Sequence, residues 1–347
     1  MGETRYPFSS MEAAAEMFRR TPLERLSTWL ETKRMARRER KKRRRHELTC
    51  LNARGPATLS PDDIPLMFIT HNDLKLMPSF LAHYRKLGVT RFICIDDVSS
   101  DGTREYLVAQ PDVDVWSSVV RFKEARRGRE WRETLFERYG TGRWYVNVDS
   151  DEYLVYDGYE ERGLKWLIPA LERMGARRML APMLDMYPVD LERADVEKLE
   201  QQAPWEIADH FDATGYAMHA MKRAFSVKGG PRYRKFGTDL EMVKYPLLFW
   251  DGECCFGPSI HQPLPYDRNF PAAMGVLLHF KFFADYAEVV DAAAAGGQYF
   301  DASAVYVKIK ENIANSGGLQ LTSDVSVRFT GSKQLLDLGF ITRLERA

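Results

Sequence analysis

Short apolar runs alternate along the chain with segments in which apolar residues recur every three or four positions. The runs Leu66–Thr70, Arg91–Ile95 and Val113–Val120 predict buried strands. Helical spacing extends from Met77 to Leu87, and a second helix is expected over Thr103–Ala109, after residues that can cap its start. This β-α-β-α-β order with short connections predicts parallel strands joined by right-handed crossovers.

The rest of the chain continues the alternation less regularly. A strand is expected at Trp144–Val148 and an extended segment at Arg178–Met183, whereas residues 225–283 mix loops with short strands. Helices are expected at Trp131–Tyr139, Leu164–Met174, 190–205, Tyr286–Ala295 and Ala304–Ala314. The pattern therefore predicts an α/β domain with a mostly parallel central sheet flanked by helices.

Residues 1–47 are expected to form a basic helical extension before this domain. Met17, Leu23, Leu26, Trp29 and Leu30 fall on one side of the helical pattern, and Thr21 with Pro22 can start a second helix. Residues 33–45 contain ten Lys or Arg and one Glu and so carry +9, which leaves −8 for the rest of a chain whose net charge is +1.

This basic run has three interpretations. It can be a solvated charged helix or arm, an anchor on an anionic lipid surface, or an arm that binds nucleic acid. The run lacks interleaved aromatic residues, which makes nucleic acid the least favoured of the three. An anionic membrane surface is therefore a candidate partner of the extension.

Composition gives the chain an ordinary globular character. Apolar residues make up 45% and charged residues 29%, enough for a sizeable core. The chain contains no run of about 18 apolar residues, so no membrane span is predicted. Its first 30 residues do not resemble a signal peptide. The four cysteines show no CxxC spacing, which fits a reduced compartment, so we expect a cytoplasmic protein. If the extension binds lipid, the protein would lie on the inner face of the membrane.

Polar clusters follow three of the expected strands. Thr70-His71-Asn72 and Asp96-Asp97 end the first two, and Asp149-Ser150-Asp151 follows the strand Trp144–Val148. Ligands of such sheets bind beyond the carboxyl ends of the strands. Two carboxylates placed two residues apart on a turn can point to one centre, where a divalent cation would offset their repulsion. A capped turn is the alternative interpretation of Asp149-Ser150-Asp151.

Three stretches in this region resemble glycosyltransferase family 2. They are Phe68–Asp73 with Pro78–Val89, then Ile95–Thr103, which is close to the family pattern Asp-Asp-x-Ser-x-Asp-Gly-Thr, and Val146–Tyr153. A looser similarity to a bacterial subgroup covers Gly229–Arg232, Lys244–Leu247 and Leu278–Lys281. The resemblance implies the nucleotide-diphospho-sugar transferase (GT-A-like) fold, with residues 48–160 as its nucleotide-sugar-binding half and 161–347 as the acceptor-binding and C-terminal part.

The activity implied by this resemblance is transfer of a sugar from a UDP- or GDP-linked donor to an acceptor hydroxyl. The implied reaction inverts the anomeric carbon and depends on Mn²⁺ or Mg²⁺, and the implied acceptor is a carbohydrate or lipid-linked molecule of surface polysaccharide or glycolipid synthesis. The donor-binding positions carried over are Thr70, His71, Asn72, Asp97 and Asp149. Many subgroup members have Arg-Asn-Glu where this chain has His71-Asn72-Asp73, so base recognition departs from the pattern.

The metal ligands carried over are Asp149 and Asp151, with a histidine late in the chain as a further contact. His279 is the candidate, His261 is a weaker competitor, and a core histidine is the alternative interpretation of both. Lys281 could pair with phosphate or be a solvated strand end. The basic residues Arg232, Arg234 and Lys244 near Gly229-Gly230 predict an acceptor or phosphate region, although a solvated basic loop has the same composition.

An inverting transferase needs a general base within hydrogen-bond reach of the acceptor hydroxyl. Asp185 and Asp239 are the candidates, and a capping carboxylate is the alternative for each. Two rival functions remain. A haloacid-dehalogenase-type phosphatase would place its nucleophilic Asp after the first strand, whereas at least three strands precede Asp149. A non-catalytic scaffold tethered by the basic extension would have no need of the Asp149/Asp151 pair.

Overall fold

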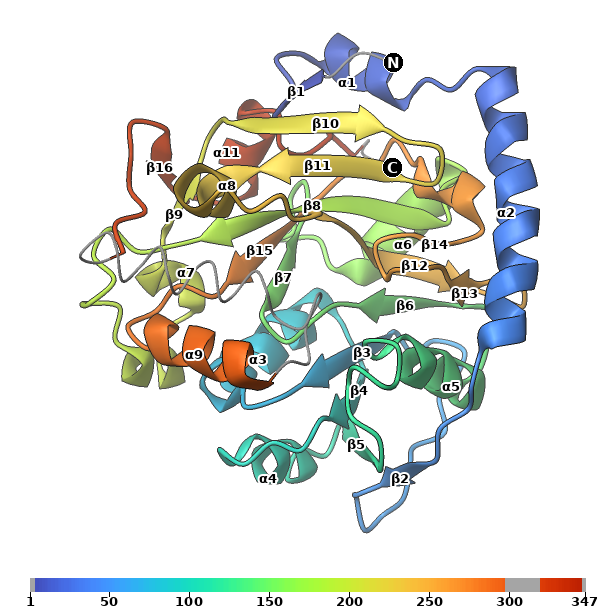
Figure 1. The fold of residues 1–347 in the computed structure, drawn as a ribbon, viewed down its shortest axis with the longest axis vertical. Coiled ribbons are helices and arrows are strands. Elements are labelled where there is room, and N and C mark those ends of the chain that lie inside the picture. The colour runs from blue at the N-terminus through green and yellow to red at the C-terminus, as the bar shows by residue number, and fades with distance from the viewer. Residues whose placement is uncertain (1–3, 297–318, 345–347) are drawn as a thin grey trace.

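The computed structural model describes residues 4–296 and 319–344 and is built on a nine-stranded sheet (Figure 1). The strand order is β2-β5-β4-β3-β6-β12-β8-β15-β7. In chain order the strands are β2 (Leu48–Cys50), β3 (Pro65–Thr70), β4 (Arg91–Asp96), β5 (Val113–Ser118), β6 (Arg143–Asn147), β7 (Glu152–Val155), β8 (Arg178–Met186), β12 (Val243–Trp250) and β15 (Val276–Phe280). The strands expected near residues 66, 91, 113, 144 and 178 are thereby confirmed.

The sheet is mixed, so the expectation of a mostly parallel sheet needs correction. The β3–β4, β4–β5, β3–β6 and β8–β15 pairs are parallel, whereas β2–β5, β6–β12, β8–β12 and β7–β15 are antiparallel. Strands β2, β12 and β7 therefore run against the other six. Antiparallel neighbours need no helical crossover between them. The pattern of predicted helices therefore does not show which strands are antiparallel.

Helices cover both faces of the sheet, because successive side chains of each strand point to opposite faces. Phe68 and Cys94 lie in one apolar cluster with α3 (Met77–Leu87), α4 (Thr103–Val108) and α6 (Leu164–Arg173). Met67 and Ile93 lie in a second cluster on the other face, with α5 (Arg129–Tyr139). The continuous apolar runs of the sequence thus correspond to strands buried on both faces.

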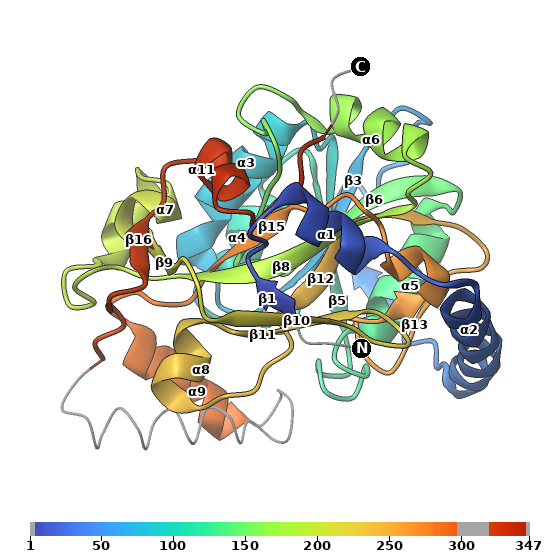
Figure 2. The same ribbon diagram turned by 90° about the horizontal axis from the view of Figure 1, so that it is seen from above.

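The N-terminal extension is helical, as expected. It consists of β1 (Thr4–Tyr6), α1 (Met11–Phe18) and α2 (Pro22–Lys42). Thr21 and Glu24 form a capping box and Pro22 occupies the first turn, which accounts for the start of α2. Figures 1 and 2 show α2 at the outer edge of the molecule.

The prediction of a charged helix over residues 190–205 is wrong. This segment holds the 3₁₀ turn η2 (Val196–Glu200), and α7 (Pro204–Ile207) begins only at its last two residues. Pro204 disfavours the helical conformation of the residue before it, which separates the two. The helix expected at 286–295 is confirmed as α9 (Tyr286–Gly296), and the one expected at 304–314 lies outside the described residues.

Smaller elements complete the described part of the chain. A three-stranded sheet has the order β1-β10-β11, and two-stranded sheets pair β13 with β14 and β16 with β9. Their bounds and those of the remaining helices are η1 (Leu74–Leu76), β9 (His210–Asp212), β10 (Tyr216–Ala220), β11 (Phe225–Gly229), α8 (Gly230–Phe236), β13 (Cys255–Phe256), β14 (Pro263–Leu264), η3 (Tyr266–Asn269), β16 (Ser326–Arg328) and α11 (Ser332–Asp337).

One connection decides where polar groups meet. Strands β6 and β7 are successive in the chain, yet β7 pairs with β15, three places away from β6 in the sheet. Residues 148–151 therefore pass first Lys244 near the start of β12 and then His279 near the end of β15. This path brings both halves of the chain to one edge of the sheet.

Candidate functional site

The polar clusters expected at the strand ends do gather at one edge of the sheet. Strands β3, β4 and β6 are parallel neighbours, so their carboxyl ends lie side by side. Asp185, near the end of β8, lies opposite His279 of β15, and His279 lies opposite Glu152 of β7. The inserted strand β12 begins at this edge and contributes Lys244.

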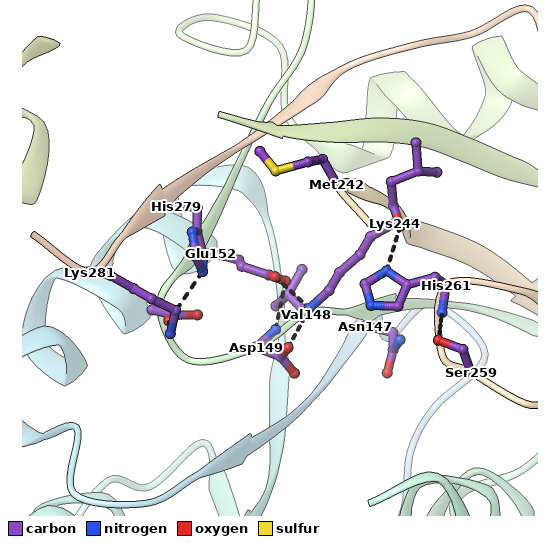
Figure 3. A network of polar contacts seen from close by, with 12 residues as sticks. Asn147, Val148, Asp149, Glu152, Met242, Lys244, Ser259, His261, His279 and Lys281 are labelled. Carbon is purple, nitrogen blue, oxygen red and sulfur yellow. Dashed lines mark hydrogen bonds and ion pairs between the residues drawn. The ribbon is translucent and has the colours of Figure 1, made fainter. Parts of the chain in front are cut away.

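Asp149 is held by two cations. Its Oδ1 accepts a hydrogen bond of 2.6 Å from Arg132 Nη2. Its Oδ2 accepts one from Lys244 Nζ (Figure 3). Burial alone would raise the pKa of the Asp149 carboxyl, but the charges of Lys244 and Arg132 outweigh it and lower the pKa to about 2. Asp149 is therefore an ionised, half-buried carboxylate at neutral pH.

Asp151, Glu152 and His279 form a second group, in which each offers a ligand atom within 4.8 Å of the others. Asp151 Oδ2 lies 3.5 Å from His279 Nε2 and accepts a 2.5 Å hydrogen bond from Lys281 Nζ. Burial opposes ionisation of Asp151, yet Lys281 and His279 bring its pKa well below the usual range. Burial raises the pKa of the Glu152 carboxyl, despite the opposing charge of Lys244.

The His279 ring is oriented by Asp185, which is itself in a buried ion pair with Arg232. Its Nδ1 lies 2.6 Å from Asp185 Oδ1, and Arg232 Nε donates a 2.7 Å hydrogen bond to Asp185 Oδ2. Burial alone would raise the pKa of Asp185, but Arg232 and His279 lower it to about 2. Burial likewise opposes protonation of His279, yet Asp151 and Asp185 raise its pKa. A ring nitrogen bonded to a carboxylate leaves the other nitrogen aimed at a ligand, as in metal sites.

Asp73 adds a further carboxylate beside Asp151. Its Oδ2 accepts hydrogen bonds from Thr70 Oγ1 at 2.9 Å and from Ser150 Oγ at 2.6 Å. Burial and the charge of Asp151 raise the pKa of Asp73. Thr70, expected to contact the donor, is itself buried and acts here by fixing Asp73.

The other expected donor-binding residues lie together on the adjoining loops. His71 Nδ1 lies 2.7 Å from the carbonyl oxygen of Asp97, and Ser100 N donates a 2.7 Å hydrogen bond to Asn72 Oδ1. The Asp97 carboxylate pairs with Arg121 Nε at 2.9 Å. His71 and Asn72 are exposed, so both can be reached by a ligand.

Three expected residues make contacts elsewhere. The Asp239 side chain is 71% exposed and lies 3.4 Å from Lys228 Nζ. Arg234 is engaged with Asp212 at 2.9 Å. His261 Nδ1 lies 2.6 Å from the carbonyl oxygen of Val243, and burial lowers the pKa of its ring to about 4. Among the described residues, these three side chains form no hydrogen bond or ion pair with Asp151 or His279.

Sequence reasoning missed three participants. Glu152 directly follows the aspartate pair, and this adjacency was a usable signal. Asp73 also had a signal, because it follows the first strand's polar end. Arg132 had none, since it lies within α5 and reaches Asp149 only through the tertiary fold.

The donor set fits a divalent cation. Carboxylate oxygens suit Mg²⁺ and Mn²⁺, and imidazole nitrogen favours the softer of the two. Lys244 and Lys281 already neutralise the same carboxylates, so a metal would have to compete with them. Basic side chains in this position also suit a diphosphate, whose charge they would share.

Comparisons with known proteins give little. No protein-family model matches the chain, and no curated protein matches it. One similar solved structure is the apo form of the bifunctional glycosyltransferase WbbM, at 18% identity and a TM-score of 0.24. That match takes in 37% of this chain and 25% of the other, which is too slight to carry an argument about fold or activity. No helix in the described ranges is long and apolar enough to cross a bilayer.

Proposed function

We propose that the protein is a metal-dependent glycosyltransferase that takes a nucleotide-diphosphate sugar as donor. The observation that carries the proposal is the group Asp151, Glu152 and His279 at the carboxyl edge of the sheet, flanked by Lys244 and Lys281. Ligands of α/β sheets bind at this edge. The family 2 resemblance of residues 66–156 points to the same strand ends.

Asp151, Glu152 and His279 are the residues that would hold the cation. A divalent cation bound there would neutralise the negative charge of a departing diphosphate. Asp149 was expected from the sequence to share this role, and here it is engaged with Arg132 and Lys244. Asp149 would add to the metal ligands if Lys244 bound the donor phosphates instead of this carboxylate.

The donor nucleotide is assigned to the loops that follow β3 and β4. His71, Asn72 and Asp97 line these loops, and the exposed His71 ring offers a stacking and hydrogen-bonding surface for a base or ribose. UDP and GDP are the two nucleotides to be tested. A carbohydrate or lipid-linked hydroxyl is the proposed acceptor.

The reaction is a single displacement. The acceptor oxygen forms a bond to the anomeric carbon while the bond from that carbon to the diphosphate oxygen breaks, and the electron pair leaves with the diphosphate. The acceptor proton goes to a carboxylate base. Both Asp185 oxygens are bonded within the core, which suits positioning of His279, whereas the Asp239 carboxylate is open to solvent. We therefore assign Asp185 to positioning and keep Asp239 as the proposed base.

Calorimetric titration with UDP and with GDP, each with and without Mn²⁺, tests the proposal. Binding of one nucleotide that depends on Mn²⁺ is expected, and Asp151→Ala should remove both this dependence and donor turnover. Asp337→Asn, a surface carboxylate of α11, is the control and should bind as the parent does. Unchanged metal dependence in Asp151→Ala would refute the metal assignment.

A non-catalytic scaffold is the second candidate. The observation in its favour is that lysines neutralise both aspartates of the pair, so the carboxylates are satisfied without a metal. A scaffold should bind neither nucleotide and should hydrolyse no donor. If a folded sample neither binds UDP or GDP nor hydrolyses a donor, the scaffold function is favoured.

A further inference from the structure

Helix α2 turns its apolar side chains outward. Leu23, Leu26 and Leu30 are 79%, 53% and 55% exposed, and Trp29 is 48% exposed. These are the residues whose spacing predicted one face of a helix, a face that normally packs against a core. Here that face is left in contact with solvent over the first two turns.

The buried face of α2 is mostly polar, with Met35 as its apolar member, and it makes several contacts with the rest of the protein. Glu31 pairs with Arg223 at 2.7 Å, and Glu39 pairs with Arg126. Tyr266 N donates a 3.0 Å hydrogen bond to Thr32 Oγ1. Because these buried contacts fix the rotation of the helix, the outward position of Leu26, Trp29 and Leu30 is built into the fold.

Basic residues continue the exposed face toward the C-terminal end of α2. Lys33, Arg37 and Lys41 follow Leu26 and Leu30 at intervals of three or four residues and are exposed. Within the described ranges, the side chains of Arg37, Arg38, Lys41 and Lys42 make no ion pair or hydrogen bond. One continuous strip therefore begins apolar and ends cationic.

The turn between β10 and β11 contacts the N-terminal half of α2. Thr28 Oγ1 donates a 2.9 Å hydrogen bond to the carbonyl oxygen of Lys222, between β10 and β11. Met221, the residue before it, is 54% exposed. Met221 is thus an exposed apolar side chain one residue away from a contact between the hairpin and α2.

We propose that this strip, Leu23–Lys42 with Met221, binds the surface of an anionic lipid bilayer. Apolar and aromatic side chains would enter the boundary between headgroups and acyl chains, while Lys and Arg remain at the anionic headgroups. A helix of this length extends about 30 Å, so both parts can touch a flat surface at once. Charge complementarity favours anionic lipid over a neutral partner, and the exposed tryptophan and leucines favour it over nucleic acid.

This inference does not depend on the proposed transfer reaction. The proposed membrane contact uses the apolar residues of α2 as well as its basic run. A purely electrostatic arm would bind through its lysines and arginines whatever lay before them. The outward leucines and Trp29 add an apolar contribution that high salt does not screen.

Co-sedimentation of the full chain with vesicles tests the inference. Vesicles of phosphatidylcholine with about 30 mol % phosphatidylserine should bind the protein, and pure phosphatidylcholine vesicles should bind it far more weakly. Arg37→Glu/Arg38→Glu/Lys41→Glu should lower binding at least about a hundredfold, at about fivefold for each lost cation. Leu26→Ser/Trp29→Ser/Leu30→Ser should lower it at least about tenfold.

Two comparisons make the result decisive. Val119→Ser with Tyr233→Ser removes exposed apolar side chains that do not belong to α2 and should leave vesicle binding unchanged. Equal vesicle binding by the parent and the Leu26/Trp29/Leu30 variant would overturn the inference. So would binding of a single-stranded oligonucleotide that exceeds vesicle binding, or a dimer that disappears in that variant while vesicles bind neither protein.

Discussion

The Nδ1 of His279 lies 2.6 Å from an oxygen of Asp185, and this pair directs the opposite ring nitrogen toward Asp151. The arrangement gives the late histidine a fixed tautomer and orientation. Asp185 is fully buried, so its influence on a bound ligand passes through the imidazole. We therefore treat Asp185 as a positioning residue of the proposed metal site.

Asp185→Asn should lower Mn²⁺ affinity by about 10- to 100-fold, the usual cost of losing an outer carboxylate of a metal-bound histidine. The amide keeps the shape of the carboxylate but loses its charge. Calorimetric titration with Mn²⁺ alone measures the change without any need for turnover.

Arg232→Gln separates this effect from simple loss of the buried ion pair. It breaks the same pair but leaves the carboxylate on His279. This variant should be less stable and yet retain Mn²⁺ affinity to within about threefold. Equal losses of affinity in Asp185→Asn and Arg232→Gln would show that the pair serves stability only.

Lys281→Met should raise the affinity for Mn²⁺ in the absence of nucleotide. Lys281 Nζ occupies an oxygen of Asp151 that the cation would use, and a charge-assisted hydrogen bond contributes about 1.5–3 kcal/mol. Removing this competitor should tighten Mn²⁺ binding about tenfold. Lys333→Met, which breaks a surface pair with Asp337, is the control and should change nothing. A weaker Mn²⁺ affinity in Lys281→Met would contradict the proposed site.

The sequence predicted the first half of the sheet well because its signals are local. Strands β3 and β4 are built around continuous apolar runs, and α3 has clear helical spacing with Gly88 at its end. Direction and order were much harder in the second half. Strand β12 pairs between β6 and β8 through contacts far apart in the chain, and no local pattern encodes such a partner.

The same difference applies to the candidate site. Asp149, Asp151 and His279 could be named as candidates from the sequence because each ends or follows an apolar run. Lys244 was assigned to an acceptor or phosphate region, and its contacts with Asp149 and Glu152 follow from the antiparallel insertion of β12. The orientation of α2 was equally hidden, because periodicity locates an apolar face but does not say what covers it.

Lys244→Met should destabilise the protein by about 3–5 kcal/mol, because it leaves the carboxylates of Glu152 and Asp149 without their shared buried cation. Urea unfolding at neutral pH measures the free energy of unfolding. Lys228→Met is the matched control, since its partner Asp239 is 71% exposed, and it should cost less than about 1 kcal/mol. Equal effects of the two substitutions would contradict a buried role for Lys244.

His83 should make the protein less stable in mild acid. Burial lowers the pKa of its ring to about 4, and its Nε2 lies 3.0 Å from the carbonyl oxygen of Leu154. An ordinary histidine in the unfolded chain titrates near pH ~6.5, so the unfolded state takes up the proton first as the pH falls. Stability present at neutral pH is therefore lost as the pH falls from about 6.5 toward 4, by about 2 kcal/mol between about pH 7 and pH 5.

Urea midpoints of the parent and of His83→Phe at both pH values test this expectation. The variant should lose less stability on acidification, by about the same 2 kcal/mol, whatever its stability at neutral pH. Some acid sensitivity should persist in it, because burial also lowers the pKa of His261 to about 4. An acid-induced loss of the same size in both proteins would mean that His83 is already able to take up a proton in the folded state.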